Sequence, residues 1–203
     1  MSDQTKIQLL PSEMELVSSP DIILTKNAIL QKVKSFLEEI QSQQINILKT
    51  YADKLPPGIL KVSPKISRGE NYKGLPWMVL DNPRHFEHNN IFAIRTMFWW
   101  GNFFSITLHV SGRYKMLVQE KILQKDLAAI NKDYLIYTGN DEWEHRIEPG
   151  AHISLQTMNK KDFDVAVLNQ KFLKIAIRFP IAPLSTIENE LIAGFKDVIK
   201  LCI

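Results

Sequence analysis

The clearest pattern of apolar and polar residues lies between Ile91 and Gly112, where two runs of β-branched and aromatic residues flank the dipeptide Gly101-Asn102. A two-residue loop with glycine in the first position is typical of a β-hairpin. Pairing the two runs across this loop places Trp100 opposite Phe103. The pattern therefore predicts an antiparallel hairpin, and we expect the rest of the chain to be organised around it.

Successive side chains of a strand point to opposite faces of a sheet, so this pairing defines two faces of the hairpin. One face is apolar except for Arg95 and is predicted to face the core. Arg95 either binds an anionic ligand or extends to solvent or an internal carboxylate. The other face combines aromatic rings with hydroxyl groups and one imidazole, and its main members are Phe92, Thr96, Phe98, Trp100, Phe103, Thr107 and His109.

If the aromatic rings of this second face were all exposed, they would form an apolar patch of a size that marks interaction sites. Three things could cover this aromatic face: a second layer of the same chain, a partner subunit, or a ligand held in a concave sheet. Together with Arg95, the seven residues of this face are our candidate binding residues.

A long helix is predicted before the sheet. Ser19-Pro20-Asp21 combines an N-cap residue, a proline at the first helical position and an acidic first turn, and the chain then runs without glycine or proline until Pro56. Its apolar stripe contains Leu30, Val33, Leu37, Ile40, Ile47, Leu48 and Tyr51. A continuous helix of this length, roughly 50 Å, exceeds what one small sheet covers. Either it bends near Ser42 to Gln44, or its overhang pairs with the same helix of another subunit.

The remaining patterns complete an α+β protein with an antiparallel β-sheet meander. Further strands are predicted at Trp77–Leu80, 133–138, 142–147, 151–157 and Lys171–Ile181. A helix inserted between strands is predicted from Met116, Leu117, Leu123, Leu127 and Ile130, and an amphipathic C-terminal helix from Ser185 onwards. We expect one domain over residues 1–203, with a helical segment at 1–58 and the sheet with its inserted and C-terminal helices at 59–203.

The composition of the chain argues against two classes of partner, nucleic acids and membranes. Among 203 residues the formal net charge is +3, too small to indicate nucleic acid, and no apolar run is long enough to predict a membrane span. Cys202 is the single cysteine, so the chain forms no internal disulfide, which fits the cytoplasm. Cys202 itself is expected to be a small buried apolar residue.

The densest polar cluster, Asp81 to Asn90, contains the pair His85 and Glu87. With His145 or His152 this pair would form a two-histidine, one-carboxylate metal site that leaves coordination positions open. The alternative interpretation of the cluster is a solvated turn that leads into the hairpin.

No nucleophile elbow, phosphate-binding loop, zinc-protease helix or dinucleotide-binding motif is present in the sequence. The sequence therefore favours a non-catalytic binding or assembly protein without a cofactor. Its partner would be another protein or a second copy, for example in a homodimer, with the aromatic face as the interface. The alternatives are a small-molecule pocket on that face and a metal-dependent enzyme.

Overall fold

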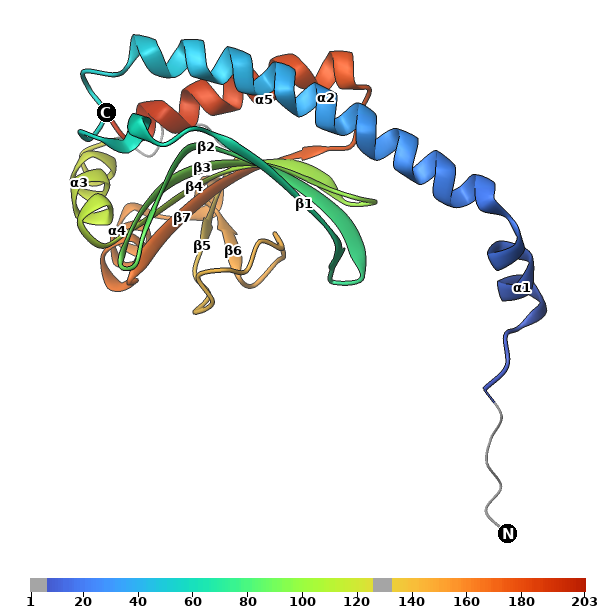
Figure 1. Ribbon diagram of the computed structural model, residues 1–203. Helices are drawn as coiled ribbons and strands as arrows, with labels where there is room; N and C mark the ends of the chain where they lie inside the picture. Colours follow the sequence, from blue (N-terminus) through green and yellow to red (C-terminus); the bar gives the residue numbers. More distant parts are fainter. Residues whose placement is uncertain (1–6, 126–132) are drawn as a thin grey trace.

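A computed structural model describes residues 7–125 and 133–203 of the chain. Within them, a curved sheet of seven strands is covered on one face by two long helices, α2 (Pro20–Thr50) and α5 (Leu184–Leu201), which lie side by side (Figure 1). The described residues contain three further helices: α1 (Pro11–Ser18), α3 (Gly112–Leu123) and α4 (Lys160–Asn169). The α+β class and the two flanking helices are thus confirmed.

The strands are β1 (Lys65–Tyr72), β2 (Leu75–Glu87), β3 (Asn90–Trp99), β4 (Phe103–Ser111), β5 (Tyr134–Tyr137), β6 (His152–Ser154) and β7 (Phe172–Pro180). Their spatial order is β1-β2-β3-β4-β7-β5-β6, with every pair antiparallel. The first four strands form a meander in chain order. β7 returns from the end of the chain and lies between β4 and β5, so the C-terminal segment completes the sheet.

The predicted register of the central hairpin is wrong by one residue. The turn contains three residues, Trp100, Gly101 and Asn102, and pairs Trp99 with Phe103. Gly101 has a positive φ of 70°, and the Asn102 amide donates to the Trp99 carbonyl at 3.0 Å. One extra turn residue exchanges the two faces of β4 relative to β3.

The corrected register separates the side chains into an apolar face and a polar face. The face under α2 and α5 carries Phe92, Ile94, Phe98, Phe104, Ile106 and Leu108, all members of the main core with Leu37, Ile40, Phe195 and Val198. The opposite face carries Arg95, Thr107 and His109 near the smaller apolar cluster of Met97, Trp99, Phe103 and Ile147. Residues 138–151, between β5 and β6, lie across this second face (Figure 1).

Several predicted elements have different bounds. The strand expected at Trp77–Leu80 extends through Glu87, because Asp81 to Glu87 continue the pairing with β3. The strand expected at 142–147 is irregular, and the one expected at 151–157 is only β6 followed by a short 3₁₀ turn, Leu155–Thr157. The inserted helix α3 is confirmed to Leu123, while Leu127 and Ile130 lie outside the described residues. Helix α4 was not predicted.

Helix α2 is one uninterrupted helix of 31 residues, with no break near Ser42 to Gln44. Its apolar stripe is buried from Leu30 onwards against the sheet and α5. The first residues of α2 project beyond the sheet, up to Lys26, which pairs with Glu70 of β1. Helix α1 continues outward from this end (Figure 1). The overhang expected from the length of the helix is therefore present.

Candidate functional site

The aromatic face that the sequence predicted as an interface is not one surface. Phe92, Thr96 and Phe98 are buried under the helices, whereas Phe103 and His109 are buried on the opposite face. Trp100 lies in the turn and is half-buried. Because Thr96 and Thr107 lie on opposite faces, the predicted small-molecule cavity lined by both is not formed. The rings of Phe92, Phe98 and Phe103 are covered by other parts of the same chain.

Arg95 is paired with an internal carboxylate. Asp81 lies directly opposite it on β2, and the guanidinium donates to both carboxylate oxygens, from Nε at 2.8 Å and from Nη2 at 3.0 Å. The third nitrogen, Nη1, lies 2.6 Å from Nε2 of His145. A guanidinium can only donate, so this Nε2 is an acceptor and the His145 imidazole is neutral. Burial, followed by the charges of Arg95 and Lys174, lowers the pKa of His145 to about 2.

Lys174 is a buried lysine on β7, with only 2 % of its surface exposed. Its ammonium group donates to the backbone carbonyl of Glu142 at 3.1 Å and to that of Glu144, and it lies 5.0 Å from the centre of the Tyr137 ring. Burial and then the charge of Arg95 lower the pKa of Lys174 to about 8. Both carbonyls belong to residues 138–151, so Lys174 attaches this segment to the sheet.

Two further contacts fix the same segment. Nε2 of His109 lies 2.8 Å from Oε1 of Glu142, and the pKa of His109 is lowered to about 3 by burial and then by the charges of Lys174 and Arg95. Tyr72 donates its hydroxyl hydrogen to the Glu144 carboxylate and accepts from the backbone amide of His145 at 2.8 Å. Burial alone would raise the pKa of Glu144, but hydrogen bonds led by that from Tyr72 lower it to about 2.

These contacts form a polar cluster between residues 138–151 and the sheet. Its members are Tyr72, Asp81, Arg95, His109, Glu142, Glu144, His145 and Lys174. Each charged group has a protein partner at hydrogen-bonding distance, which is the usual state of buried polar groups. We conclude that the cluster attaches the irregular segment to the sheet. Sequence reasoning missed Lys174, although its place on the polar side of an alternating strand was visible.

The predicted metal site is not assembled. Nε2 of His85 lies 3.1 Å from Glu87 and 3.2 Å from the Tyr114 hydroxyl, whereas His145 contacts Arg95 and His152 packs against the Tyr137 ring. Over residues 7–125 and 133–203, no group of three or more histidine, cysteine, aspartate or glutamate side chains could hold a metal ion. His85 pairs with Phe92, on the face under the helices, because the register of β2 shifts between Asp81 and Arg84, whereas His145 contacts Arg95 on the opposite face and His152 lies on edge strand β6.

Exposed apolar side chains are most concentrated in residues 7–29, which we call the arm. Helix α1 has no buried residue. The arm contains half of the exposed large apolar side chains among the described residues: Ile7, Leu9, Leu10, Met14, Leu16, Val17, Ile22, Ile23, Leu24 and Ile29. Such a concentration marks an interaction surface rather than ordinary scattered exposure.

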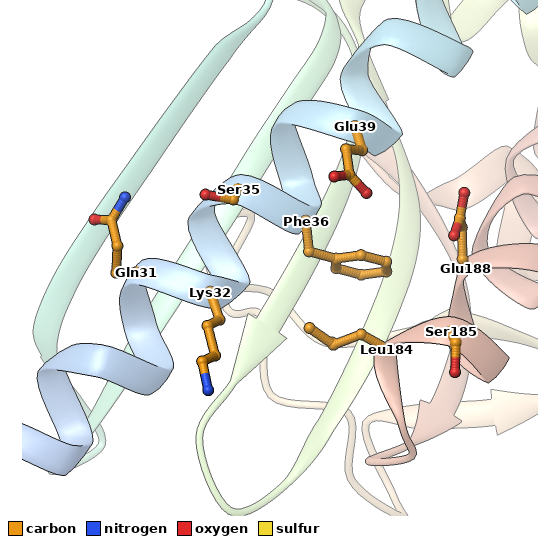
Figure 2. A pocket seen from close by; sticks show the side chains of 8 residues that line it. All are labelled: Gln31, Lys32, Ser35, Phe36, Glu39, Leu184, Ser185 and Glu188. Atoms are coloured by element: carbon orange, nitrogen blue, oxygen red, sulfur yellow. The ribbon is translucent and has the colours of Figure 1, made fainter.

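Two grooves lie where the arm meets the body. The first, between α2 and the start of α5, has a volume of about 420 Å³, and Figure 2 shows Phe36 and Leu184 extending towards each other within it. The second has a volume of about 280 Å³ and lies beside the β3–β4 turn, where it is lined mainly by apolar residues that include Ile29, Phe98 and Trp100. Lys32 and Leu184 line both grooves, so the two are neighbours.

Comparisons with known proteins add no functional information. No protein-family model and no curated protein matches the sequence. A solved structure of a conserved hypothetical protein from Pyrococcus furiosus matches with a TM-score of 0.39 and 10 % sequence identity, covering 86 % of this chain and 99 % of that chain. Within the part of the chain that the structure describes, no helix has both the length and the apolar character needed to cross a membrane.

Proposed function

We propose that this protein is a non-catalytic assembly protein whose arm makes the contact between two copies of the chain. The observation that carries the proposal is the continuity of the α2 apolar stripe. Leu30 and Val33 are buried in the body, and the same face carries Ile29 one turn before Val33 and Ile23 and Ile22 two turns before Leu30, all three exposed. Lys26 lies between them on this face and pairs with Glu70 of β1. Amphipathic helices bury such a stripe, so the exposed part is a surface for another protein.

A second copy is the partner that this surface fits best. The arm of each copy carries the same stripe, and two such helices packed antiparallel about a two-fold axis cover both stripes at once. The antiparallel arrangement also brings the acidic first turn of α2, at Asp21, towards the basic residue Lys32 of the other copy. We place this assembly in the cytoplasm, on the ground that Cys202 is the only cysteine and is buried.

The double variant Ile22→Glu/Ile23→Glu is expected to convert the dimer into a monomer. Each substitution replaces buried apolar area with a charge, and losing about 1.5–3 kcal/mol per site raises the dissociation constant by at least about 100-fold for the pair. Sedimentation equilibrium over micromolar concentrations measures this change. Both residues are exposed within one chain, so circular dichroism should show an unchanged sheet and body.

The matched control is Val165→Glu/Leu168→Glu on α4. These two residues are 49 % and 52 % exposed, close to 48 % and 55 % for Ile22 and Ile23, but they lie outside the arm. The control is expected to remain dimeric. A wild-type chain that stays monomeric at high micromolar concentration, or an arm variant as dimeric as the control, would contradict the proposal.

A further inference from the structure

We propose that the groove beside the β3–β4 turn binds a small amphipathic carboxylate, an unbranched alkanoate whose chain lies on the apolar walls and whose head group meets Lys32. This binding does not depend on self-association through the arm. Three separate parts of the chain line the groove: one face of α2, the ends of β3 and β4 with the turn between them, and the segment that joins β7 to α5.

The floor of this groove belongs to the main core. Val33, Phe98 and Phe104 all line it, and each is no more than 5 % exposed. The ring centre of Phe98 lies 5.1 Å from that of Phe104 and 6.3 Å from that of Trp100, which Phe98 meets edge-on. The floor is therefore held in place by contacts within the chain, so a ligand does not have to order it.

The walls fit an alkyl chain. Ile29 and Ile181 stand at the rim, 38 % and 49 % exposed, above the buried floor. Small-molecule pockets are mostly apolar and carry a few polar groups that orient the ligand. The groove has a volume of about 280 Å³. If each carbon of the chain takes about the volume of one liquid water, roughly 30 Å³, the groove holds roughly nine carbons.

Lys32 selects a carboxylate over an uncharged head group. Among the described residues that line the groove, it is the only one with a charged side chain. No hydrogen bond or ion pair between described residues involves its ammonium group. Glu39 and Glu188 line the neighbouring groove but not this one. A carboxylate beside Lys32 therefore gains a charge-assisted hydrogen bond without displacing a partner from the same chain.

Titration calorimetry of the wild-type chain with alkanoates of increasing length tests the inference. From hexanoate to octanoate we expect the affinity to rise about fourfold for each added methylene, the fold-change that corresponds to burying one such group. The gain should stop once the groove is full, so dodecanoate should bind no more than about fourfold tighter than decanoate. Octanol, which has the same chain as octanoate without the charge, should bind about three- to fivefold more weakly than octanoate.

Three variants separate the parts of the groove. Lys32→Gln should remove the preference for octanoate over octanol and leave octanol binding unchanged. Lys161→Gln, on the exposed side of α4, is the matched control and should keep the wild-type preference. Ala182→Phe puts a ring into the half-buried lining and should weaken both ligands at least tenfold, with an unchanged circular dichroism spectrum.

Tryptophan fluorescence locates the bound chain. An octanoate with a terminal bromine atom quenches a tryptophan that it contacts. Trp100 lines the groove, whereas Trp77, Trp99 and Trp143 do not. We therefore expect this ligand to quench the wild-type chain, and most of the quenching to be lost in Trp100→Phe.

Four outcomes would overturn the inference. The first is a wild-type chain that does not bind octanoate. The second is binding that survives in Ala182→Phe together with quenching that survives in Trp100→Phe, which places the ligand elsewhere. The third is an equal loss of octanoate and octanol in Lys32→Gln. The fourth is octanoate binding by the Ile22→Glu/Ile23→Glu chain alone, which would mean that a second copy covers the groove and would leave self-association intact.

Discussion

Replacing Asp81 with alanine is expected to lower the free energy of unfolding by about 3–5 kcal/mol, the usual cost of removing one partner of a buried ion pair. The side chains of Asp81 and Arg95 are 9 % and 15 % exposed, so water cannot solvate the guanidinium that remains. Arg95 would retain only His145, which is neutral, and would lie near the positive charge of Lys174. Urea unfolding followed by circular dichroism measures the change.

The control for this prediction is Glu70→Ala. Glu70 pairs with Lys26 at 2.7 Å, but its side chain is 61 % exposed, and removing such a surface pair costs no more than about 1 kcal/mol. The double variant Asp81→Leu/Arg95→Leu is expected to lose less stability than Asp81→Ala alone, because no unpaired charge remains buried. An Asp81→Ala chain as stable as the Glu70→Ala chain would show that the pair is solvated.

Acid is expected to destabilise the protein well above the pKa values of its carboxylates. In the unfolded chain a histidine has its ordinary pKa of 6.5, whereas in the folded chain the pKa is about 3 for His109 and about 2 for His145. Between pH 6.5 and pH 3 the unfolded chain therefore binds protons that the folded chain does not. The free energy of unfolding falls as the pH falls through this range, by about 1.4 kcal/mol per pH unit for each such histidine.

Glu144 acts in the same direction at lower pH. Its pKa is about 2 in the folded chain against an ordinary value of 4.5, so its contribution is present above pH 4.5 and is lost as the pH falls towards 2. Acid unfolding is therefore expected to begin as His109 and His145 take up protons. It is expected to be completed at lower pH, as the Glu144 carboxylate is protonated.

Denaturant unfolding at pH 7, 6, 5 and 4 tests the histidine contribution. His109→Gln keeps a donor for Glu142 but cannot bind a proton, so the slope of stability against pH should fall by about 1.4 kcal/mol per pH unit between pH 6 and pH 4. His88→Gln, in the exposed β2–β3 turn, is the control and should keep the wild-type slope. Parallel pH profiles for the two variants would mean that His109 is protonated in the folded chain.

The elements with strong periodicity were predictable, and the register that joins them was not. Alternation located β3, β4 and β7, and the spacing of apolar residues located α2 and α5. The sequence Trp100-Gly101-Asn102 is compatible with loops of two or three residues, since both place glycine in a turn. The number of loop residues decides whether His109 shares a face of the sheet with Arg95 or with Thr96. Tertiary packing, not the local sequence, selects that number.

Some features of the candidate site were also predictable from the sequence, and others were not. The overhang of α2 followed from its length, and the pairing of Arg95 with an internal carboxylate was one of two interpretations of an arginine on an apolar face. That Asp81 is the partner depends on β2 continuing through a segment rich in charge, which resembled a loop. The contacts of Lys174 with Glu142 and Glu144 depend on a segment without periodicity, so local sequence carries no signal for them.

The two edge strands of the sheet limit how many copies of the chain can assemble. Edge strand β1 carries Lys65, Arg68 and Glu70 and has an irregular register after Gly69, and the opposite edge, β6, is only three residues long. Charges, irregularities and short length all discourage the addition of a further strand. Growth by strand addition would be open-ended, whereas contact between two equivalent helices uses both surfaces and stops at two copies. In the proposed dimer, the chain thus exposes an apolar helix for association without exposing a template for fibre growth.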